Sequence, residues 1–225
     1  MPRPFRLLLL RHGQTPSNVK GALDTGPPGP GLTTLGHSQA ATAAQALLEE
    51  SYEAVYVSRL VRTHETAAPI AGARRRGAVR QHGLEEIRAG RFEMRTDREA
   101  VDGYLGTIAE WIHGNLDLQM PGAETGREFL ARYDDAITRI ADQQHRGSAI
   151  VVSHGAAIRT WVSNRIPDSA GHPEATEYLH NTACITVEGH PRLGWELVDW
   201  NSQPIGGRFL DDEAAPDPTG DPVRD

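Results

Sequence analysis

An apolar run near the start of the chain places the strongest constraint on its fold. Residues 7–10 are four consecutive leucines, Phe5 lies just before them, and the run ends abruptly at Arg11 and His12. An unbroken run of this length is typical of a strand that is buried on both faces of a sheet. Gly13 then allows a sharp turn and a close approach of a ligand to the backbone. We therefore expect a central strand that delivers Arg11 and His12 to its carboxyl end, where open α/β sheets bind ligands.

Segments typical of strands and helices alternate along the rest of the chain. Residues 16–31 are rich in glycine and proline, so we expect no regular element there. Because alternating strands and helices build parallel sheets covered on both faces, the sequence predicts a three-layer α/β/α sandwich with a mainly parallel sheet. The further strands are expected at 54–58, 78–82, 148–153, 184–188 and 195–200, and the helices at 32–50, 59–73, 97–113, 124–145 and 156–164.

The charge of the chain is concentrated at its end. The formal net charge is −7, and residues 211–225 hold six carboxylates and one arginine, so residues 1–210 carry only −2. The terminal stretch has almost nothing to bury, and we expect an acidic, disordered tail after a single domain at 1–210. The body shows no basic stripe of the kind that binds nucleic acid, and we expect no nucleic-acid partner.

Two further absences in the sequence limit the class of protein. No apolar run approaches the roughly 20 residues of a membrane span, and no signal peptide is recognisable, so we expect a cytoplasmic protein without a membrane partner. Cys184 is the only cysteine, which excludes an intrachain disulfide and favours a buried structural role. The histidines form no cluster with zinc-ligand spacing, and we expect neither a metal nor a cofactor.

Four short stretches carry candidate chemistry, each next to the end of an expected element. Arg11 and His12 follow the first strand, Arg62 lies early in the helix after the second, Glu86 lies in the loop after the third, and His154 follows strand 148–153. Taken singly, each has an ordinary structural interpretation. Together, at ends that converge in a parallel sheet, they form a pocket of two arginines and two histidines that suits a phosphate dianion.

The same stretches resemble the histidine phosphatase superfamily, which includes the phosphoglycerate mutases. The first block is the Arg-His-Gly motif at 11–13, and the third, residues 84–93, is similar to the Leu-x-Glu-Ile-x-x-Gly-x-Trp-Glu stretch of the phosphatase branch. The second is a Ser-x-x-x-Arg-x-x-x-Thr-Ala pattern at 58–67, and the fourth is Ser-His-Gly at 153–155. The resemblance covers residues 5–160 in order and implies a phosphoglycerate mutase-like fold.

The resemblance also implies a role for each matching residue. His12 is the histidine that takes the phosphoryl group, and Glu86, rather than Glu85, is the proton donor. The remaining matches bind the phosphate oxygens: Arg11, Asn18, Arg62 and His154. Further candidates for contacting the substrate are Gln14, Thr25 and Gly155.

These matches favour a metal-independent phosphomonoesterase that acts on a small phosphorylated metabolite. A phosphoglycerate mutase is the alternative within enzymes, but such mutases usually add a basic insertion after the acid, and residues 95–117 contain only Arg95 and Arg98 as cations. A non-catalytic protein that binds a phosphorylated ligand is the alternative from another class. The sequence leaves the substrate open, and it does not separate a monomer from a homodimer.

Overall fold

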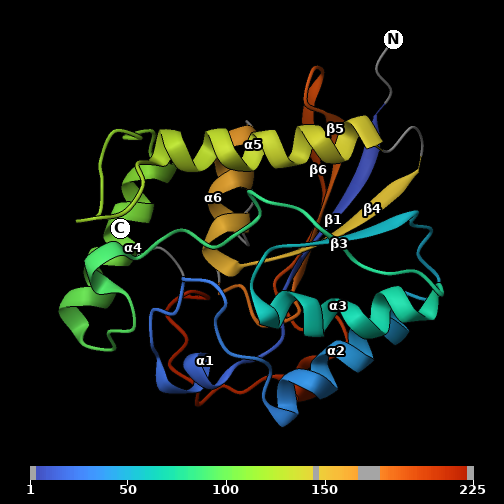
Figure 1. Ribbon diagram of the computed structural model, residues 1–225, viewed down its shortest axis with the longest axis horizontal. Coiled ribbons are helices and arrows are strands. Elements are labelled where there is room, and N and C mark those ends of the chain that lie inside the picture. The colour runs from blue at the N-terminus through green and yellow to red at the C-terminus, as the bar shows by residue number, and fades with distance from the viewer. Residues whose placement is uncertain (1–3, 144–146, 167–177, 222–225) are drawn as a thin grey trace.

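A single six-stranded sheet forms the centre of the protein (Figure 1). The computed structural model describes residues 4–143, 147–166 and 178–221. The strand order is β3-β2-β4-β1-β5-β6, with β3, β2, β4 and β1 paired in parallel and β5 and β6 antiparallel, so the expected mainly parallel α/β fold is confirmed. The strands are β1 (Phe5–Arg11), β2 (Ala54–Val57), β3 (Val79–Arg80), β4 (Ser148–Ser153), β5 (Cys184–His190) and β6 (Gly194–Asn201).

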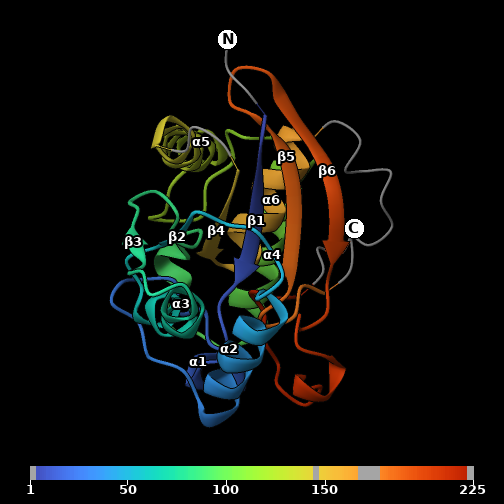
Figure 2. The ribbon, with the colours of Figure 1, turned by 90° about the vertical axis from the view of Figure 1, so that its right-hand side faces the viewer.

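Helices cover the two faces of the sheet, which Figure 2 shows nearly edge-on. They are α1 (Pro16–Lys20), α2 (Thr34–Ala46), α3 (Val61–Ala73), α4 (Arg98–Ile112), α5 (Gly126–Gln143) and α6 (Gly155–Arg165), with short 3-10 turns η1 (Gly90–Phe92) and η4 (Arg208–Leu210). Because side chains alternate along a strand, β1 serves both layers. Leu8 and Leu10 pack with side chains of α2 and α3, whereas Leu7 and Leu9 pack with those of α4, α5 and α6.

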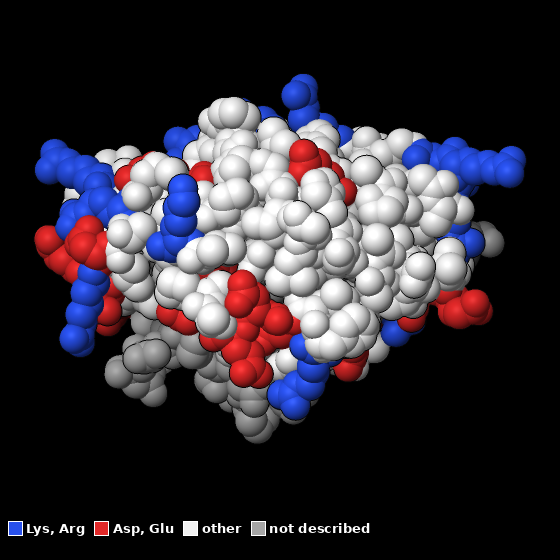
Figure 3. All heavy atoms as spheres, turned by 90° about the horizontal axis from the view of Figure 1, so that it is seen from below, with Lys and Arg blue, Asp and Glu red and all other residues white. Residues whose placement is uncertain are grey.

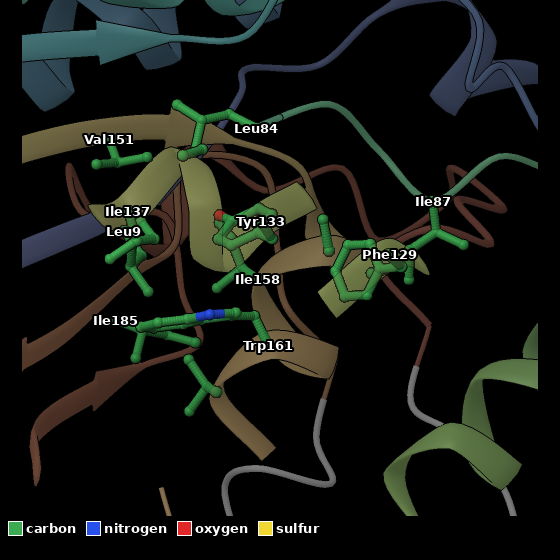
Figure 4. Close-up of a cluster of buried hydrophobic side chains, with 14 of the residues drawn as sticks. Leu9, Leu84, Ile87, Phe129, Tyr133, Ile137, Val151, Ile158, Trp161 and Ile185 are labelled. Atoms are coloured by element: carbon green, nitrogen blue, oxygen red, sulfur yellow. The ribbon is translucent and has the colours of Figure 1, made fainter. Parts of the chain in front are cut away.

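The larger core lies between the sheet and helices α5 and α6 (Figure 4). Leu9 and Val151 from the strands pack against Tyr133 from α5 and against Ile158 and Trp161 from α6. All five residues are fully buried. Burial of this many large apolar side chains supplies the main driving force for folding, at about 1.5–3 kcal/mol for each. The rigid packing fixes the carboxyl ends of β1 and β4, which carry the candidate site.

Residues 16–20 correct one expectation, because they form helix α1 where the composition indicated no regular element. Thr15 caps the helix, since its hydroxyl accepts from the Asn18 backbone N–H at 3.2 Å and the Asn18 side chain accepts from the Thr15 backbone N–H at 2.8 Å. Pro16 occupies the first helical position, where its missing N–H costs nothing. This reciprocal capping outweighs the breaker residues that follow from Gly26 onward.

The C-terminal segment also differs from the expectation of a tail separate from the domain. Residues 217–220 are buried, and in Figure 1 the red C-terminal segment lies beside α1.

The face in Figure 3 is mostly uncharged, with Lys and Arg gathered mainly toward its edges. Within the part of the chain that the structure describes, no helix combines the length and the apolar character that crossing a membrane requires.

Candidate active site

The parallel pairing of β1 with β4 brings the two candidate histidines together. Arg11 lies opposite Ser153 in the register, and the His12 backbone N–H donates to the Ser153 carbonyl at 3.1 Å. The residues that follow these two strand ends are His12 and His154, whose ring centroids lie 5.2 Å apart. Both side chains are buried, at 2% and 0% exposure. The carboxyl ends of β1 and β4 therefore carry two neighbouring imidazoles, as the alternation of strands and helices in the sequence predicted.

Two hydrogen bonds fix the protonation of His12. Its Nδ1 lies 2.8 Å from the Gly13 carbonyl oxygen, which only accepts, so Nδ1 carries the hydrogen. Its Nε2 receives a hydrogen bond from Arg62 Nε at 3.1 Å, and because a guanidinium only donates, Nε2 holds the free electron pair. Burial first, and then the charges of Arg62 and Arg11, lower the pKa of His12 well below its ordinary value of 6.5. His12 is thus a neutral imidazole with its lone pair facing the arginine.

We expect His12 to stay neutral as the pH falls through the range in which exposed histidines take up a proton. A lowered pKa keeps the ring unprotonated below 6.5, because protonation would add a buried charge between two arginines. NMR of protein with 15N-labelled histidine at about pH 6 should show His12 as the Nδ1–H tautomer, while the urea-unfolded protein shows protonated rings. A His12 ring that is half protonated near pH 6.5 in the folded protein would contradict this interpretation.

Arg62 comes from the first turn of α3 and is 3% exposed. Besides its bond to His12, its Nη2 donates to the Asp24 carbonyl at 3.0 Å, and its Nη1 lies 3.8 Å from the Asp24 carboxylate. Burial is the main influence on the guanidinium and lowers its pKa, yet the arginine remains protonated at neutral pH. A fixed positive charge therefore lies directly against the lone pair of His12.

Glu86 lies in the loop after β3, is 1% exposed, and its carboxyl group contacts the first turn of α6. Its Oε1 accepts backbone N–H bonds from Ile87 at 2.8 Å and Ala157 at 2.9 Å, and Oε2 accepts from Ala156 at 3.3 Å. These bonds and the arginines favour the charged form. Burial nevertheless dominates and raises the pKa of Glu86. A carboxyl group with a raised pKa can hold a proton near neutral pH and release it to a neighbouring oxygen.

His154 is held by Ser58, the residue that follows β2. Its Nε2 lies 2.9 Å from the Ser58 hydroxyl, and its Nδ1 has no hydrogen-bond partner among the described residues. Burial, and then the charge of Arg62, lower the pKa of His154 well below its ordinary value. The motif that contains Arg62 therefore also supplies, through Ser58, a hydrogen-bond partner for His154.

Arg11 and Asn18, which the sequence assigned to phosphate binding, already have an anionic partner, the carboxylate of Asp217. Arg11 Nη2 forms an ion pair with the Asp217 carboxylate and donates to Thr219 Oγ1 at 3.1 Å, while Nη1 donates to the Leu179 carbonyl at 2.5 Å. Asn18 Nδ2 donates to the other oxygen of Asp217 at 2.8 Å. Burial opposes the charge, but Arg11 and these hydrogen bonds lower the pKa of Asp217, which is 2% exposed. The Asp217 carboxylate thus occupies donors of Arg11 and Asn18, two of the residues expected to bind phosphate.

The three further candidates lie in different places. Gln14 Nε2 donates to the Asp212 carboxylate at 2.8 Å, which ties the opening loop to the C-terminal segment. Thr25 donates its hydroxyl hydrogen to Glu93 at 2.5 Å and accepts from the Ala89 N–H, so it braces the loop of Glu86. At Gly155 an added Cβ would lie 3.0 Å from Arg11 Nε and 2.4 Å from the Thr219 carbonyl oxygen, so only glycine fits there.

Comparison with known proteins agrees with this arrangement. Residues 7–203 match the sequence profile described as the histidine phosphatase superfamily (branch 1). The chain belongs to this superfamily. The resemblance inferred from its motifs is confirmed.

Relatives and solved structures of the superfamily extend the comparison. PE-PGRS family protein PE_PGRS11 of Mycobacterium tuberculosis is 34% identical over 89% of this chain and 37% of its own length. The 2-carboxy-D-arabinitol-1-phosphatase of Triticum aestivum is 28% identical over 90% of this chain and 38% of its own length. The chain therefore spans only 37–38% of these relatives. The crystal structure of a phosphoglycerate mutase from Bacillus anthracis shares the fold, with a TM-score of 0.76 at 19% identity over 92% of this chain and 97% of that one.

One residue that supports this candidate site, Arg132 of α5, had no signal in the sequence. Its guanidinium donates to the carbonyls of Gly83, Glu85 and Glu86, each at 2.9 Å, and pairs with Glu124 at 2.6 Å. Because Arg132 donates hydrogen bonds to three carbonyls of one loop, it fixes the backbone from which the Glu86 side chain projects. On the sequence it reads as an ordinary polar position of an amphipathic helix.

Asp217 is the second missed residue, and its removal should make stability depend on phosphate. Asp217→Asn leaves the Arg11 guanidinium buried without a counter-charge, which we expect to lower the free energy of unfolding by about 3–5 kcal/mol. Inorganic phosphate should restore more of that stability than it adds to the wild type, because it supplies the missing anion. Thermal unfolding with increasing phosphate measures both effects.

Asp212→Asn is the matched control, because Asp212 lies in the same segment but accepts a hydrogen bond from the neutral Gln14 side chain instead of pairing with an arginine. It should unfold near the wild-type temperature with the wild-type response to phosphate. Equal phosphate responses for Asp217→Asn and Asp212→Asn would show that Asp217 does not share its partners with phosphate.

Proposed function

We propose that this chain is a phosphomonoesterase that works without a metal ion, through a phosphoryl group carried on His12 Nε2. The observation that carries the proposal is the protonation state of His12, a neutral imidazole whose free electron pair faces a buried arginine. Arg11, Arg62 and Asn18 offer donors for the charge of the phosphoryl oxygens, which is the main requirement of phosphoryl transfer.

In the first step, His12 Nε2 attacks phosphorus and the bond from phosphorus to the ester oxygen breaks. Glu86 gives its proton to that oxygen, so the product leaves as a neutral alcohol and Glu86 becomes a carboxylate. The raised pKa of Glu86 supports this role, because the group must be protonated when the substrate arrives. The substrate phosphate takes the place of the Asp217 carboxylate on Arg11 and Asn18.

In the second step, a water molecule attacks the phosphoryl group and the bond from phosphorus to His12 Nε2 breaks. The Glu86 carboxylate accepts one proton from that water, which restores the acid, and inorganic phosphate leaves. The backbone N–H groups of Ile87 and Ala157 stabilise the carboxylate between the two steps. The same residue thereby serves once as acid and once as base.

Hydrolysis is favoured over a mutase reaction by the surface charges after the acid loop. Arg95 pairs with Asp97 at 2.6 Å and with Glu99 at 2.9 Å, and Arg98 pairs with Asp102 at 3.1 Å. Both cations of the segment therefore pair with carboxylates at and just before the beginning of α4, and neither is left unpaired for a substrate. The Triticum aestivum relative is named a phosphatase, which also supports hydrolysis.

Release of inorganic phosphate from a panel of phosphomonoesters, with a metal chelator present, tests the proposal. We expect hydrolysis of at least one ester that the chelator does not reduce. Isomerisation of 3-phosphoglycerate in the presence of a bisphosphoglycerate primer, without phosphate release, would instead indicate the mutase. Failure to hydrolyse any ester would contradict the proposed function.

A further inference from the structure

A second buried arginine lies near the site and has no assigned task. Arg159 of α6 is 1% exposed, and its Nε, Nη1 and Nη2 have no hydrogen-bond partner among residues 4–143, 147–166 and 178–221. An unpaired buried charge costs several kcal/mol, so native proteins rarely keep one without a function. Unsatisfied buried donors of this kind call for a specific explanation.

The helix geometry directs Arg159 toward the phosphate-binding end of β1. Arg159 is four residues after Gly155 and lies on the same face of α6. That face meets Arg11, since the Cβ position at Gly155 is 3.0 Å from Arg11 Nε. Long side chains on a helix lean toward its N-terminus, which brings the Arg159 guanidinium back over this turn.

Arg11 adds a further free donor at the same place, because its Nε also has no hydrogen-bond partner within the described part of the chain. The two guanidinium groups repel each other. Burial first, and then the charge of Arg11, lower the pKa of Arg159 to about 10, whereas the charges of Glu86 and Asp221 raise it. An anion placed between the arginines would satisfy donors of both and remove this repulsion.

The chain's own C-terminal segment shows that acidic groups suit this region. Asp217 is paired with Arg11, and the charge of Asp221, four residues later, acts favourably on Arg159. Two carboxylates of one short segment thus lie near two arginines. A substrate that takes the place of this segment meets the same pair of positive charges.

We propose that Arg159, together with Arg11 Nε, binds a second acidic group of the substrate, a carboxylate or a second phosphate, beside the ester phosphate. This inference rests on the proposed phosphomonoesterase function and narrows its substrates to phosphorylated acids and bisphosphates. Guanidinium is the cation best suited to such groups, since it donates two parallel hydrogen bonds to carboxylate or phosphate oxygens. Arg159 is then a specificity-determining residue rather than a structural one.

Matched substrate pairs test the proposal and distinguish the two acidic groups. The first pair is 3-phosphoglycerate and glycerol 3-phosphate, which differ in a carboxylate. The second is glucose 1,6-bisphosphate and glucose 6-phosphate, which differ in a phosphate. We expect the wild type to prefer the acidic member of one pair by about 10- to 100-fold in kcat/KM, the range expected for hydrogen bonds to charged groups.

Arg159→Met should bring that preference close to one, and Arg159→Lys should restore part of it. Arg165→Met is the control on the same helix, since Arg165 pairs with Asp134 and is one-third exposed; it should keep the wild-type preference. Without ligand, Arg159→Met should unfold at a temperature no lower than the wild type, because it removes an unpaired buried charge. A preference unchanged in Arg159→Met, or a large loss of thermal stability in that variant, would overturn the proposal.

Calorimetric binding to the His12→Ala variant separates this inference from the proposed function. That variant should bind the acidic member of the preferred pair about 10- to 100-fold more tightly, and adding Arg159→Met should abolish the difference. Equal binding of both members in both pairs would overturn the second anion position even if hydrolysis is observed. Preferential binding without any hydrolysis by the wild type would support the anion position and contradict the phosphatase.

Discussion

Replacing His12 with alanine is expected to lower phosphomonoester turnover by at least about four orders of magnitude, the loss typical when a covalent nucleophile is removed. The reason is that the neighbouring groups cannot substitute for it. Glu86 serves as the acid, and the Nε2 of His154 is engaged with Ser58, which leaves only Nδ1, the ring nitrogen next to the side-chain stem, without a partner among the residues that the structure describes. Steady-state release of inorganic phosphate by purified wild type and variant measures the effect.

His64→Ala is the matched control, because it removes a histidine from α3 outside the site. It should retain wild-type turnover. Folding of His12→Ala is checked by circular dichroism and thermal unfolding, since the substitution removes the ring that accepts a hydrogen bond from the buried Arg62. A folded His12→Ala protein with turnover within tenfold of the wild type would exclude His12 as the residue that carries the phosphoryl group.

Replacing Glu86 with glutamine is expected to lower turnover by about 10²- to 10⁴-fold, the usual contribution of a general acid or base. The amide keeps the size of the side chain and can still accept from the Ile87 and Ala157 N–H groups, but it cannot give or take the proton. The loss should be smaller for the first step with p-nitrophenyl phosphate, whose leaving group needs little protonation. Phosphorylated enzyme should then accumulate, because water lacks its base.

Glu85→Gln provides the comparison for Glu86→Gln, since the two residues are adjacent and both buried. Glu85 pairs with Arg59 at 2.7 Å and accepts from the Gly83 N–H, so both of its carboxylate oxygens are already engaged. Burial opposes its charge, but the hydrogen bond from Arg59 lowers the pKa of Glu85, which makes it a poor proton donor. A larger loss of turnover for Glu85→Gln than for Glu86→Gln would reverse the assignment.

The sheet and the convergence of its polar ends were predictable because they depend on local patterns. The leucine run of β1 and the apolar run 148–153 each match the strand that forms, and the register of β1 with β4 then places their terminal histidines side by side. Helices α2 and α4 begin within two residues of their expected starts, and the structure shows that Thr33 and Asp97 cap them. In each case a short segment contained the signal that determines its structure.

The unpredicted parts depend on contacts between residues far apart in the sequence. Asp217 lies 206 residues after its partner Arg11, and nothing near it in the sequence indicates burial. Its segment has few apolar groups, so composition favours a solvated tail, whereas one buried ion pair and the hydrogen bonds around it hold residues 217–220 against the site. Arg132 was invisible for the same reason, because its partners are backbone carbonyls that carry no sequence signature.

The most direct test of the account is detection of the phosphoryl group on His12. Enzyme mixed with a hydrolysed ester and quenched in alkali, which preserves phosphohistidine, is digested and mapped by mass spectrometry. We predict phosphorylation of the peptide that contains His12, stronger in Glu86→Gln and absent in His12→Ala. Turnover at the wild-type rate with no phosphorylated histidine at any time after mixing, or with the group on His154 instead, would contradict the account.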